Sequence, residues 1–336
     1  MRKTYYVKLK QKPQKNSFKI FIFFIASTAG ILLFFNFLKR TNPPGFVQPK
    51  VLSSSNSVSQ LFPVSPSPSP INTVISTITP IEDKELGQAV QNALMGTYGS
   101  YGVVIKNLKT AEQYTLQENT QYAAASLYKL WVMAATYKQI KDGKLNDNDI
   151  LSENVAVLNT KFQIPPESAE LKEGKITLSV HDALEKMINI SDNYAALLLT
   201  EKIRLSTISL FLIDNGFSQS SISENGKPPM TTPHDIALYF EKLYNGRLID
   251  ANYSNKMISL LREQKLNDKI PRYLPYEVNV AHKTGELDEY THDAGIVYVN
   301  NYDYIIVVLS KSDDPELAAI RIANVSEAVY NYFEAK

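Results

Sequence analysis

The chain has 336 residues, enough for one large or two small domains, and its 44% hydrophobic and 21% charged content is ordinary for a globular protein. Residues 1–81 contain ten Lys and Arg and no acid, so the remainder carries 25 Lys and Arg against 34 Asp and Glu. This acidic remainder lacks the basic footprint of a nucleic-acid-binding domain, and we expect no nucleic-acid partner. Cysteine is absent, which excludes disulfides and thiolate metal sites.

The first 38 residues predict a membrane anchor. Residues 1–19 are a basic tail, and residues 20–38 are an apolar run. At ~1.5 Å per residue this run spans roughly 29 Å, close to the ~30 Å hydrocarbon core of a bilayer. Charged residues and prolines follow where a signal peptide would have a small-residue cleavage site, so we predict an uncleaved, single-pass transmembrane helix. The excess of positive charge before the run places the N-terminus in the cytoplasm and the rest of the chain at the cell surface or in the periplasm.

A tether and one globular domain follow the predicted anchor. Residues 39–82 are rich in Ser, Thr and Pro and include the sequence SPSPSP. Such a segment buries too little apolar surface to order itself, and its prolines keep it extended. We therefore predict a disordered tether over residues 39–82 and a folded domain over residues 83–336.

Within this domain the pattern predicts strands at both ends and helices in the middle. Residues 84–97 and 316–333 suit helices, and Ser179 and Thr232 begin two more with capping-box spacing. The predicted strands are residues 101–108, 113–116, 277–283, 294–299 and 304–309. The simplest closure is an antiparallel sheet built by the two ends of the domain, with a helical insert packed on it, which is an α+β fold.

A helix predicted over residues 123–140 organises the domain. Its middle is apolar all round, which is typical of a helix buried on every side. Ser126 and Lys129 break this pattern and share one face, and Ser126 falls in the first turn, where free N–H groups favour developing negative charge. Taken alone, this pair could equally be a capping serine beside a lysine that extends its charge to solvent.

Two further motifs favour a chemical role for this pair. Ser191-Asp192-Asn193 lies between two predicted helices, and Lys283-Thr284-Gly285 closes a late strand. The order S-x-x-K, S-D-N, K-T-G is the set found in class A β-lactamases and penicillin-binding proteins. Residues 84–336 resemble the class A β-lactamase catalytic domain. The resemblance implies an α/β (α+β) fold, with a five-stranded antiparallel sheet flanked by helices and a helical subdomain.

The resemblance also implies a role for each motif residue. Ser126 would be the nucleophile, Lys129 its base, and Ser191 the group that passes a proton to the leaving nitrogen. Asn193 would bind the amide side chain of the substrate. The carboxylate of the substrate would be held by Lys283 and Thr284, with Gly285 allowing close approach of the strand. The oxyanion hole would consist of the backbone N–H groups of Ser126 and Glu286.

One element of the family is missing from the sequence. Class A enzymes carry Glu-x-x-x-Asn in the loop before the position of Thr231, and its glutamate activates the water that removes the acyl group. Here the loop is short, and its acid, Glu224, is followed directly by Asn225. Glu224 could be a displaced base, but the pattern favours a solvated loop residue. Acylation is therefore better supported than deacylation.

The sequence favours a membrane-anchored serine hydrolase that opens β-lactams through an acyl-enzyme on Ser126. A penicillin-binding-protein-like D,D-peptidase with slow deacylation, acting on cell-wall peptides, is the first alternative. A non-catalytic domain that binds the cell wall is the second. The four histidines lack metal-ligand spacing and suit structural or capping roles, so we expect no metal and no cofactor. No oligomer signal is visible, and we expect a monomer.

Overall fold

The computed structural model describes residues 81–222, 227–299 and 302–336. The predicted cytoplasmic tail and transmembrane helix, and all but the last two residues of the predicted tether, lie outside the described residues. None of the helices in the described ranges is long and apolar enough to cross a membrane.

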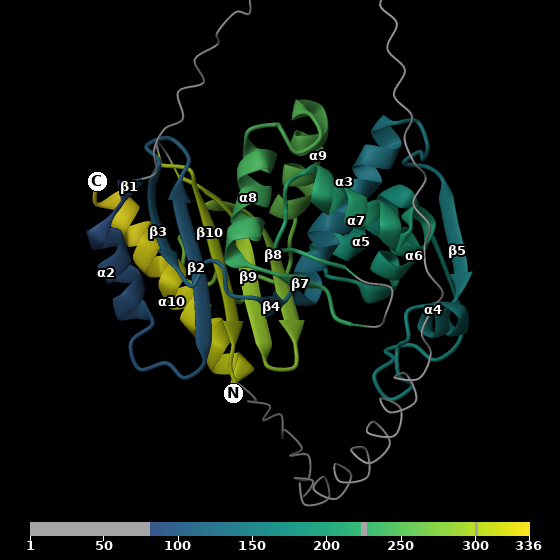
Figure 1. Ribbon diagram of the computed structural model, residues 1–336, viewed down its shortest axis with the longest axis horizontal. Coiled ribbons are helices and arrows are strands. Elements are labelled where there is room, and N and C mark those ends of the chain that lie inside the picture. The colour runs from purple at the N-terminus through teal and green to yellow at the C-terminus, as the bar shows by residue number, and fades with distance from the viewer. Residues whose placement is uncertain (1–80, 223–226, 300–301) are drawn as a thin grey trace, which may run out of the picture. The chain divides into compact units, whose positions relative to one another are not determined.

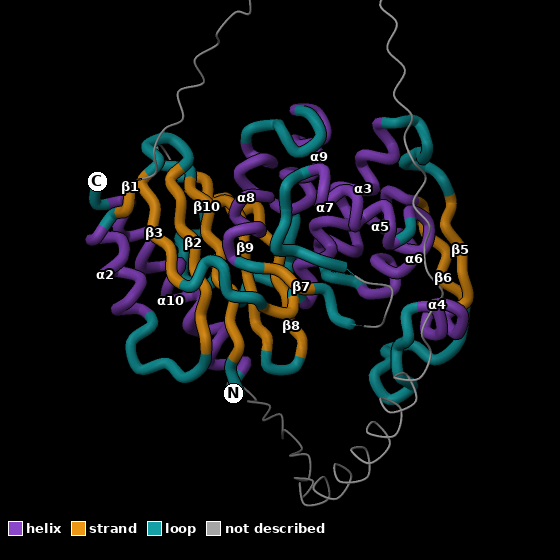
Figure 2. Tube along the Cα trace, in the orientation of Figure 1, coloured by secondary structure: helices purple, strands orange, loops and turns teal. Residues whose placement is uncertain are grey.

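The described residues form a mixed α/β fold with one main sheet, whose strand order is β1-β3-β2-β10-β9-β8 (Figure 2). The five longer strands are all antiparallel, which confirms the five-stranded antiparallel sheet. The two-residue strand β1 adds a sixth, parallel to β3, which the sequence did not predict. The strands of the sheet are β1 (Ile81–Glu82), β2 (Ser100–Asn107), β3 (Glu112–Leu116), β8 (Asn279–Leu287), β9 (Tyr290–Tyr298) and β10 (Tyr304–Lys311).

Helices cover both faces of this sheet (Figure 1). Two shorter strand pairs, β4 (Tyr122–Ala123) with β7 (Met230–Thr231) and β5 (Ile150–Asn154) with β6 (Lys175–Ser179), lie outside the main sheet. The helices are α2 (Lys84–Ala93), α3 (Tyr128–Lys141), α4 (Val155–Lys161), α5 (Val180–Asn189), α6 (Asn193–Ile203), α7 (Leu205–Asp214), α8 (Pro233–Tyr244), α9 (Ala251–Arg262) and α10 (Pro315–Glu334).

The core has two parts, one on each face of the sheet. Strand β10 shows the division, because Ile305 and Val307 pack with the helices from the middle of the chain, whereas Ile306 and Val308 pack with α2 and α10. Side chains alternate between the faces of a strand, so a strand covered on both faces reads as an unbroken apolar run. The two ends of the domain therefore build one side of the molecule, as the sequence predicted.

Helix α3 is buried from Lys129 to Tyr137, which confirms the predicted buried helix. Its Trp131 is 1% exposed. The helix begins later than predicted, at Tyr128, because Tyr122 and Ala123 pair with β7 and Ala125–Leu127 form a 3-10 turn. The predicted caps are confirmed: Ser179 Oγ accepts from Asp182 N at 3.0 Å, and Thr232 Oγ1 accepts from Asp235 N at 3.3 Å.

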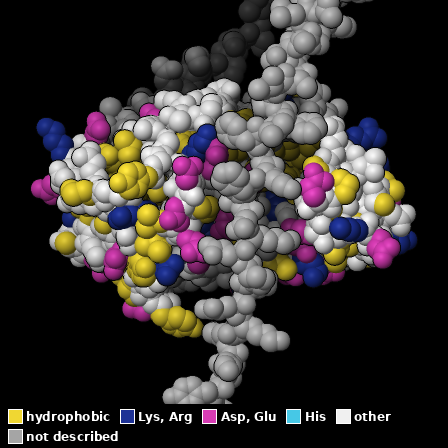
Figure 3. All heavy atoms as spheres, turned by 90° about the horizontal axis from the view of Figure 1, so that it is seen from below, with side chains coloured by type: hydrophobic (Ala, Val, Ile, Leu, Met, Phe, Trp, Pro, Cys, Tyr) yellow, Lys and Arg dark blue, Asp and Glu magenta, His cyan; other side chains and the backbone are white. Residues whose placement is uncertain are grey.

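The surface of the domain mixes charges of both signs. On the face shown in Figure 3, Lys and Arg side chains lie among Asp and Glu side chains, and the described residues there form no broad patch of one sign.

Candidate active site

Ser126 lies in the 3-10 turn that precedes α3, not in the first turn of the helix as predicted. The residue before it, Ala125, has a φ of 45°. A non-glycine residue in this left-handed region is strained and persists only where its surroundings fix it. Two hydrogen bonds hold the segment just before the turn: Ala124 N donates to Pro229 O at 2.7 Å, and His292 Nε2 lies 2.8 Å from Ala123 O.

Lys129 connects α3 to the start of α6. Its buried ammonium group donates to Asn193 Oδ1 at 2.7 Å, to the carbonyl oxygen of Ser191 at 2.6 Å and to Ser191 Oγ at 3.1 Å. These bonds use all three of its donors. Within the described ranges, Lys129 Nζ makes no hydrogen bond to Ser126 Oγ.

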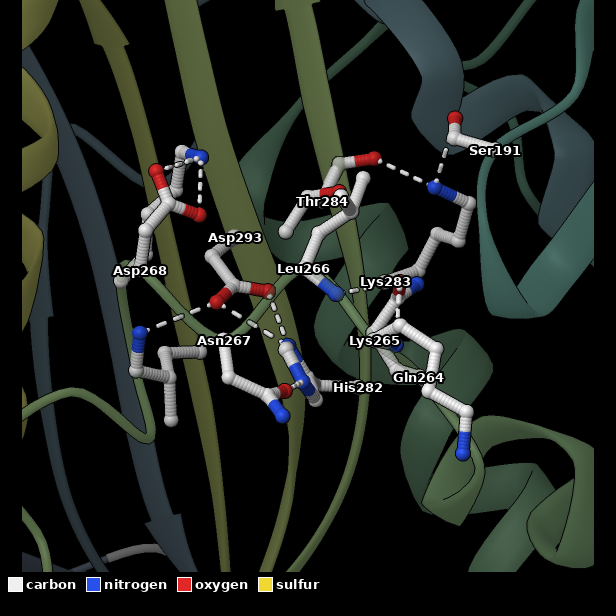
Figure 4. Close-up of polar contacts among 12 residues, drawn as sticks. Ser191, Gln264, Lys265, Leu266, Asn267, Asp268, His282, Lys283, Thr284 and Asp293 are labelled. Carbon is white, nitrogen blue, oxygen red and sulfur yellow. Dashed lines mark hydrogen bonds and ion pairs between the residues drawn. The ribbon is translucent and has the colours of Figure 1, made fainter.

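Ser191 stands between two lysines. Its Oγ accepts from Lys129 Nζ at 3.1 Å and from Lys283 Nζ at 3.0 Å, and the latter contact is visible in Figure 4. Its backbone is strained, with a φ of 58°. Asp192 caps α6 by accepting from Ala195 N at 2.8 Å, which explains why the S-D-N motif opens this helix. Four predicted site residues, Lys129, Ser191, Asn193 and Lys283, therefore form one hydrogen-bonded network.

Burial shifts the protonation of both lysines. Burial lowers the pKa of Lys129 to about 8, although the charges of Asp192 and Glu170 oppose this shift. Burial, reinforced by the charge of Lys129, lowers the pKa of Lys283 well below its ordinary value. Two ammonium groups that share one hydroxyl cannot both stay protonated at low cost, so the site favours a neutral amine near physiological pH.

The K-T-G motif lies inside strand β8, which continues to Leu287 instead of closing at Lys283 as predicted. Lys283 and Thr284 are buried, and Lys283 Nζ donates to the Thr284 carbonyl oxygen at 2.8 Å. The Glu286 side chain is 66% exposed and lies 2.5 Å from Lys269 Nζ.

Gly285 brings β8 against the turn that carries Ser126. A methyl group added at Gly285 would lie 3.3 Å from Ala124 O, Ala125 Cβ and Leu127 Cγ. We predicted that this glycine gives a ligand room to approach the strand. In the structure its small size also lets β8 pack closely against the turn that carries Ser126.

Two buried histidines lie in strands β8 and β9. His282 Nδ1 lies 2.9 Å from Asp293 Oδ1, and both side chains are labelled in Figure 4. Asp293 Oδ2 also accepts from Ile270 N at 3.0 Å. His292 Nδ1 accepts from Ser310 N at 3.1 Å, so its Nε2 carries the proton that bonds Ala123 O. Burial lowers the pKa of His292 to about 4, which keeps this tautomer neutral.

Glu170 also reaches the site, although the sequence analysis did not select it. Its Oε1 accepts from Asn193 Nδ2 at 2.5 Å, on the side of the amide opposite Lys129. Glu167, Glu170 and Glu173 are spaced alike in one loop, so nothing in the sequence distinguishes the middle one. Glu224 and Asn225 lie outside the described residues.

The family model described as the beta-lactamase enzyme family matches residues 85–333. The chain belongs to this family. This match confirms the resemblance that the sequence motifs indicated. A search of curated proteins found no match.

Solved structures share the fold of this beta-lactamase family member at low sequence identity. PBP-A is 21% identical, with a TM-score of 0.67, over 76% of this chain and 98% of that one. The beta-lactamase from Sphaerobacter thermophilus is 23% identical, with a TM-score of 0.66, over 75% and 97%. A class A beta-lactamase from Bacteroides cellulosilyticus is 20% identical, with a TM-score of 0.65, over 75% and 98%. The family is thus the beta-lactamase enzyme family, and the fold is the one that these beta-lactamases share with PBP-A.

Proposed function

We propose that this protein opens the amide bond of β-lactams through an acyl-enzyme on Ser126. The observation that carries the proposal is the position of Ser191 Oγ, 3.1 Å from Lys129 Nζ and 3.0 Å from Lys283 Nζ. A hydroxyl between two buried amines can accept a proton from one side and release it on the other. Acyl transfer from an amide to a serine requires such a proton transfer, because the serine hydroxyl loses a proton and the departing nitrogen gains one.

The hydrogen bonds of Lys129 support one route for the proton. Two of its three partners, the Ser191 carbonyl oxygen and Asn193 Oδ1, can only accept hydrogen bonds. When Lys129 is a neutral amine, its lone pair can accept a proton from the third partner, the Ser191 hydroxyl. We infer that the Ser126 proton is taken up by the Lys129–Ser191 pair as Ser126 Oγ bonds to the carbonyl carbon.

The second half of acylation returns that proton to the substrate. As the carbon–nitrogen bond of the lactam breaks, Ser191 donates its proton to the departing nitrogen and is reprotonated from Lys129. Lys283 and Thr284 would hold the substrate carboxylate, and the backbone N–H groups of Ser126 and Glu286 would stabilise the oxyanion. No net proton is gained or lost, because the proton of Ser126 ends on the lactam nitrogen.

A slow-deacylating, penicillin-binding-protein-like D,D-peptidase is the second candidate. It is favoured by the loop before Thr231, which lacks the Glu-x-x-x-Asn element. One solved neighbour, the L158E variant of PBP-A, is described as an acyl-enzyme complex with penicillin G. The two candidates share the acylation step and differ in how long the acyl-enzyme lasts.

Intact-mass spectrometry on the full-length chain, purified in a mild detergent and mixed with benzylpenicillin, tests both. We expect the mass to rise by one penicillin in the wild type and to stay unchanged in Ser126→Ala. An adduct that disappears within minutes identifies a β-lactamase, and one that persists identifies the D,D-peptidase behaviour. Labelling of Ser126→Ala would exclude Ser126 as the nucleophile. Binding with no adduct in the wild type would favour the non-catalytic cell-wall module.

We further propose that the domain acts outside the cytoplasm, held there by a transmembrane helix over residues 20–38. The basic residues before this apolar run and the Ser- and Pro-rich segment after it support the proposal. Protease added to intact spheroplasts should remove the domain. Protection of the domain until the membrane is permeabilised would contradict this topology.

A further inference from the structure

The loop that carries Glu170 is held against α6 by a buried tyrosine. The Tyr194 hydroxyl accepts from Leu171 N at 3.1 Å and lies 2.8 Å from Leu171 O and 3.0 Å from Asn159 Oδ1. Asn159 Nδ2 also donates to Leu171 O, at 2.9 Å. Tyr194 is 5% exposed and directly follows Asn193. Both backbone groups of Leu171 are thereby fixed, so the residue before it has a defined place beside Asn193.

Glu170 occupies that place. Its carboxylate accepts from Asn193 Nδ2 at 2.5 Å, and burial lowers the pKa of Lys129 against the opposing charges of Asp192 and Glu170. Glu170 and Asn193 are both exposed residues. Asn193 Nδ2 has two hydrogens, so it can bond Glu170 with one and a substrate amide with the other. A substrate amide bound at Asn193 therefore brings its acyl side chain close to the Glu170 carboxylate.

We propose that Glu170 selects substrates whose acyl side chain carries an ammonium group next to the amide. This proposal rests on the proposed function. An ammonium there would meet a fixed carboxylate, whereas a carboxylate would meet a like charge. The neighbouring charges of the loop reinforce the negative charge of Glu170, because Glu167 and Glu173 outnumber Lys172. The substrate class is thus amine-bearing acyl donors, whether penicillins or peptides.

Three penicillins that differ in one substituent test this selectivity. Ampicillin carries an α-ammonium, benzylpenicillin has no charge there, and carbenicillin carries an α-carboxylate. Second-order acylation rate constants are measured by intact mass on the full-length chain, at a pH where the ampicillin amine is protonated. We expect wild-type rates in the order ampicillin, benzylpenicillin, carbenicillin, with steps of about three- to fivefold, the size of an exposed ion pair.

The decisive variant is Glu170→Gln, because it keeps an acceptor for Asn193 and removes the charge. We expect it to bring the ampicillin-to-benzylpenicillin ratio near one and to raise the carbenicillin-to-benzylpenicillin ratio. Glu173→Gln, in the same loop but without a contact to Asn193 in the described structure, should leave both ratios close to wild type.

Each result has a distinct meaning. Unchanged ratios in Glu170→Gln, or equal shifts in Glu173→Gln, would overturn the role of Glu170. Wild-type rates in the reverse order would overturn the ammonium preference. If no penicillin acylates Ser126, the proposed function fails and the preference falls with it. Because the readout is a ratio within one variant, a general loss of active protein does not imitate the expected result.

Discussion

At the scale of single residues, the protonation state of Lys129 should set the rate of acylation. Burial lowers its pKa to about 8, below its ordinary value of 10.5. A base must be neutral to accept a proton, so the acylation rate should rise with pH through about 8 and then level off. Stopped-flow acylation by benzylpenicillin across this range measures the profile.

The matched variant for this prediction is Lys129→Arg, whose guanidinium stays protonated. We expect it to lose acylation by about a hundredfold or more at every pH. A flat wild-type profile would show that another group limits the rate, and retained acylation in the arginine variant would remove Lys129 from the role of base.

Most of the site could be predicted from its motifs, whereas Glu170 could not. Ser126, Lys129 and Lys283 belong to motifs whose chemistry depends on residue type and short spacing, and such spacing is visible in a sequence. Glu170 reaches Asn193 because Tyr194 holds the backbone of Leu171. That contact depends on the hydrogen bond between the Tyr194 hydroxyl and the loop at Leu171, and no local sequence pattern predicts it.

At the scale of elements, Gly285 determines how closely β8 approaches the serine turn. In Gly285→Ala the new methyl group would lie 3.3 Å from three atoms of that turn, so the turn must move by a few tenths of an ångström. We expect acylation to fall about tenfold while the free energy of unfolding changes by about 1 kcal/mol. Acylation kinetics and urea unfolding measure the two effects.

Gly87→Ala is the control for this substitution. Its new methyl group would meet the Tyr114 ring at 2.9 Å, between α2 and β3, and would leave the serine turn untouched. It should destabilise the fold without slowing acylation by the remaining folded protein. Equal effects of the two variants on acylation would refute a specific role for Gly285.

The element bounds show which local signals can be overridden. Residues 123–127 have helical composition, yet Tyr122 and Ala123 pair with β7, so α3 begins only at Tyr128. Strand β8 was predicted to end at the motif lysine, but its pairing with β9 extends the ladder to Leu287. The partner of Tyr122 and Ala123 lies far away in the sequence, whereas that of residues 283–287 is the next strand of the same hairpin. In both cases pairing with a partner decides the boundary, and local propensity does not contain that pairing.

At the scale of the whole molecule, the face of the sheet away from the site should carry much of the stability. Phe333 is fully buried there, with ring centroids 4.9 Å from Tyr304 and 5.1 Å from Tyr332. Phe333→Ala should lower the free energy of unfolding by about 3–5 kcal/mol. Urea unfolding tests this, with the exposed Glu334→Ala as the control. Acylation by the folded fraction should not change, and a loss of acylation would show that the two faces are coupled.

The architecture followed from the order of the elements along the chain. Apolar alternation near both ends and helices between them predicted a sheet closed by the two ends, because no other arrangement buries the strands so simply. The sixth strand escaped prediction because Ile81–Glu82 is two residues long, too short to show a period.

The central pairing of the sheet also governs how the protein is made. Strand β2 pairs with β10 from Asn107–Tyr304 to Ser100–Lys311, so nearly the whole domain separates the two strands in sequence. A ribosome delivers β2 well before β10, and the edge of β2 that pairs with β10 has no partner during the interval. The domain can therefore complete its fold only after β10 has been made. If the predicted export occurs, this delay keeps the chain unfolded enough to cross a membrane.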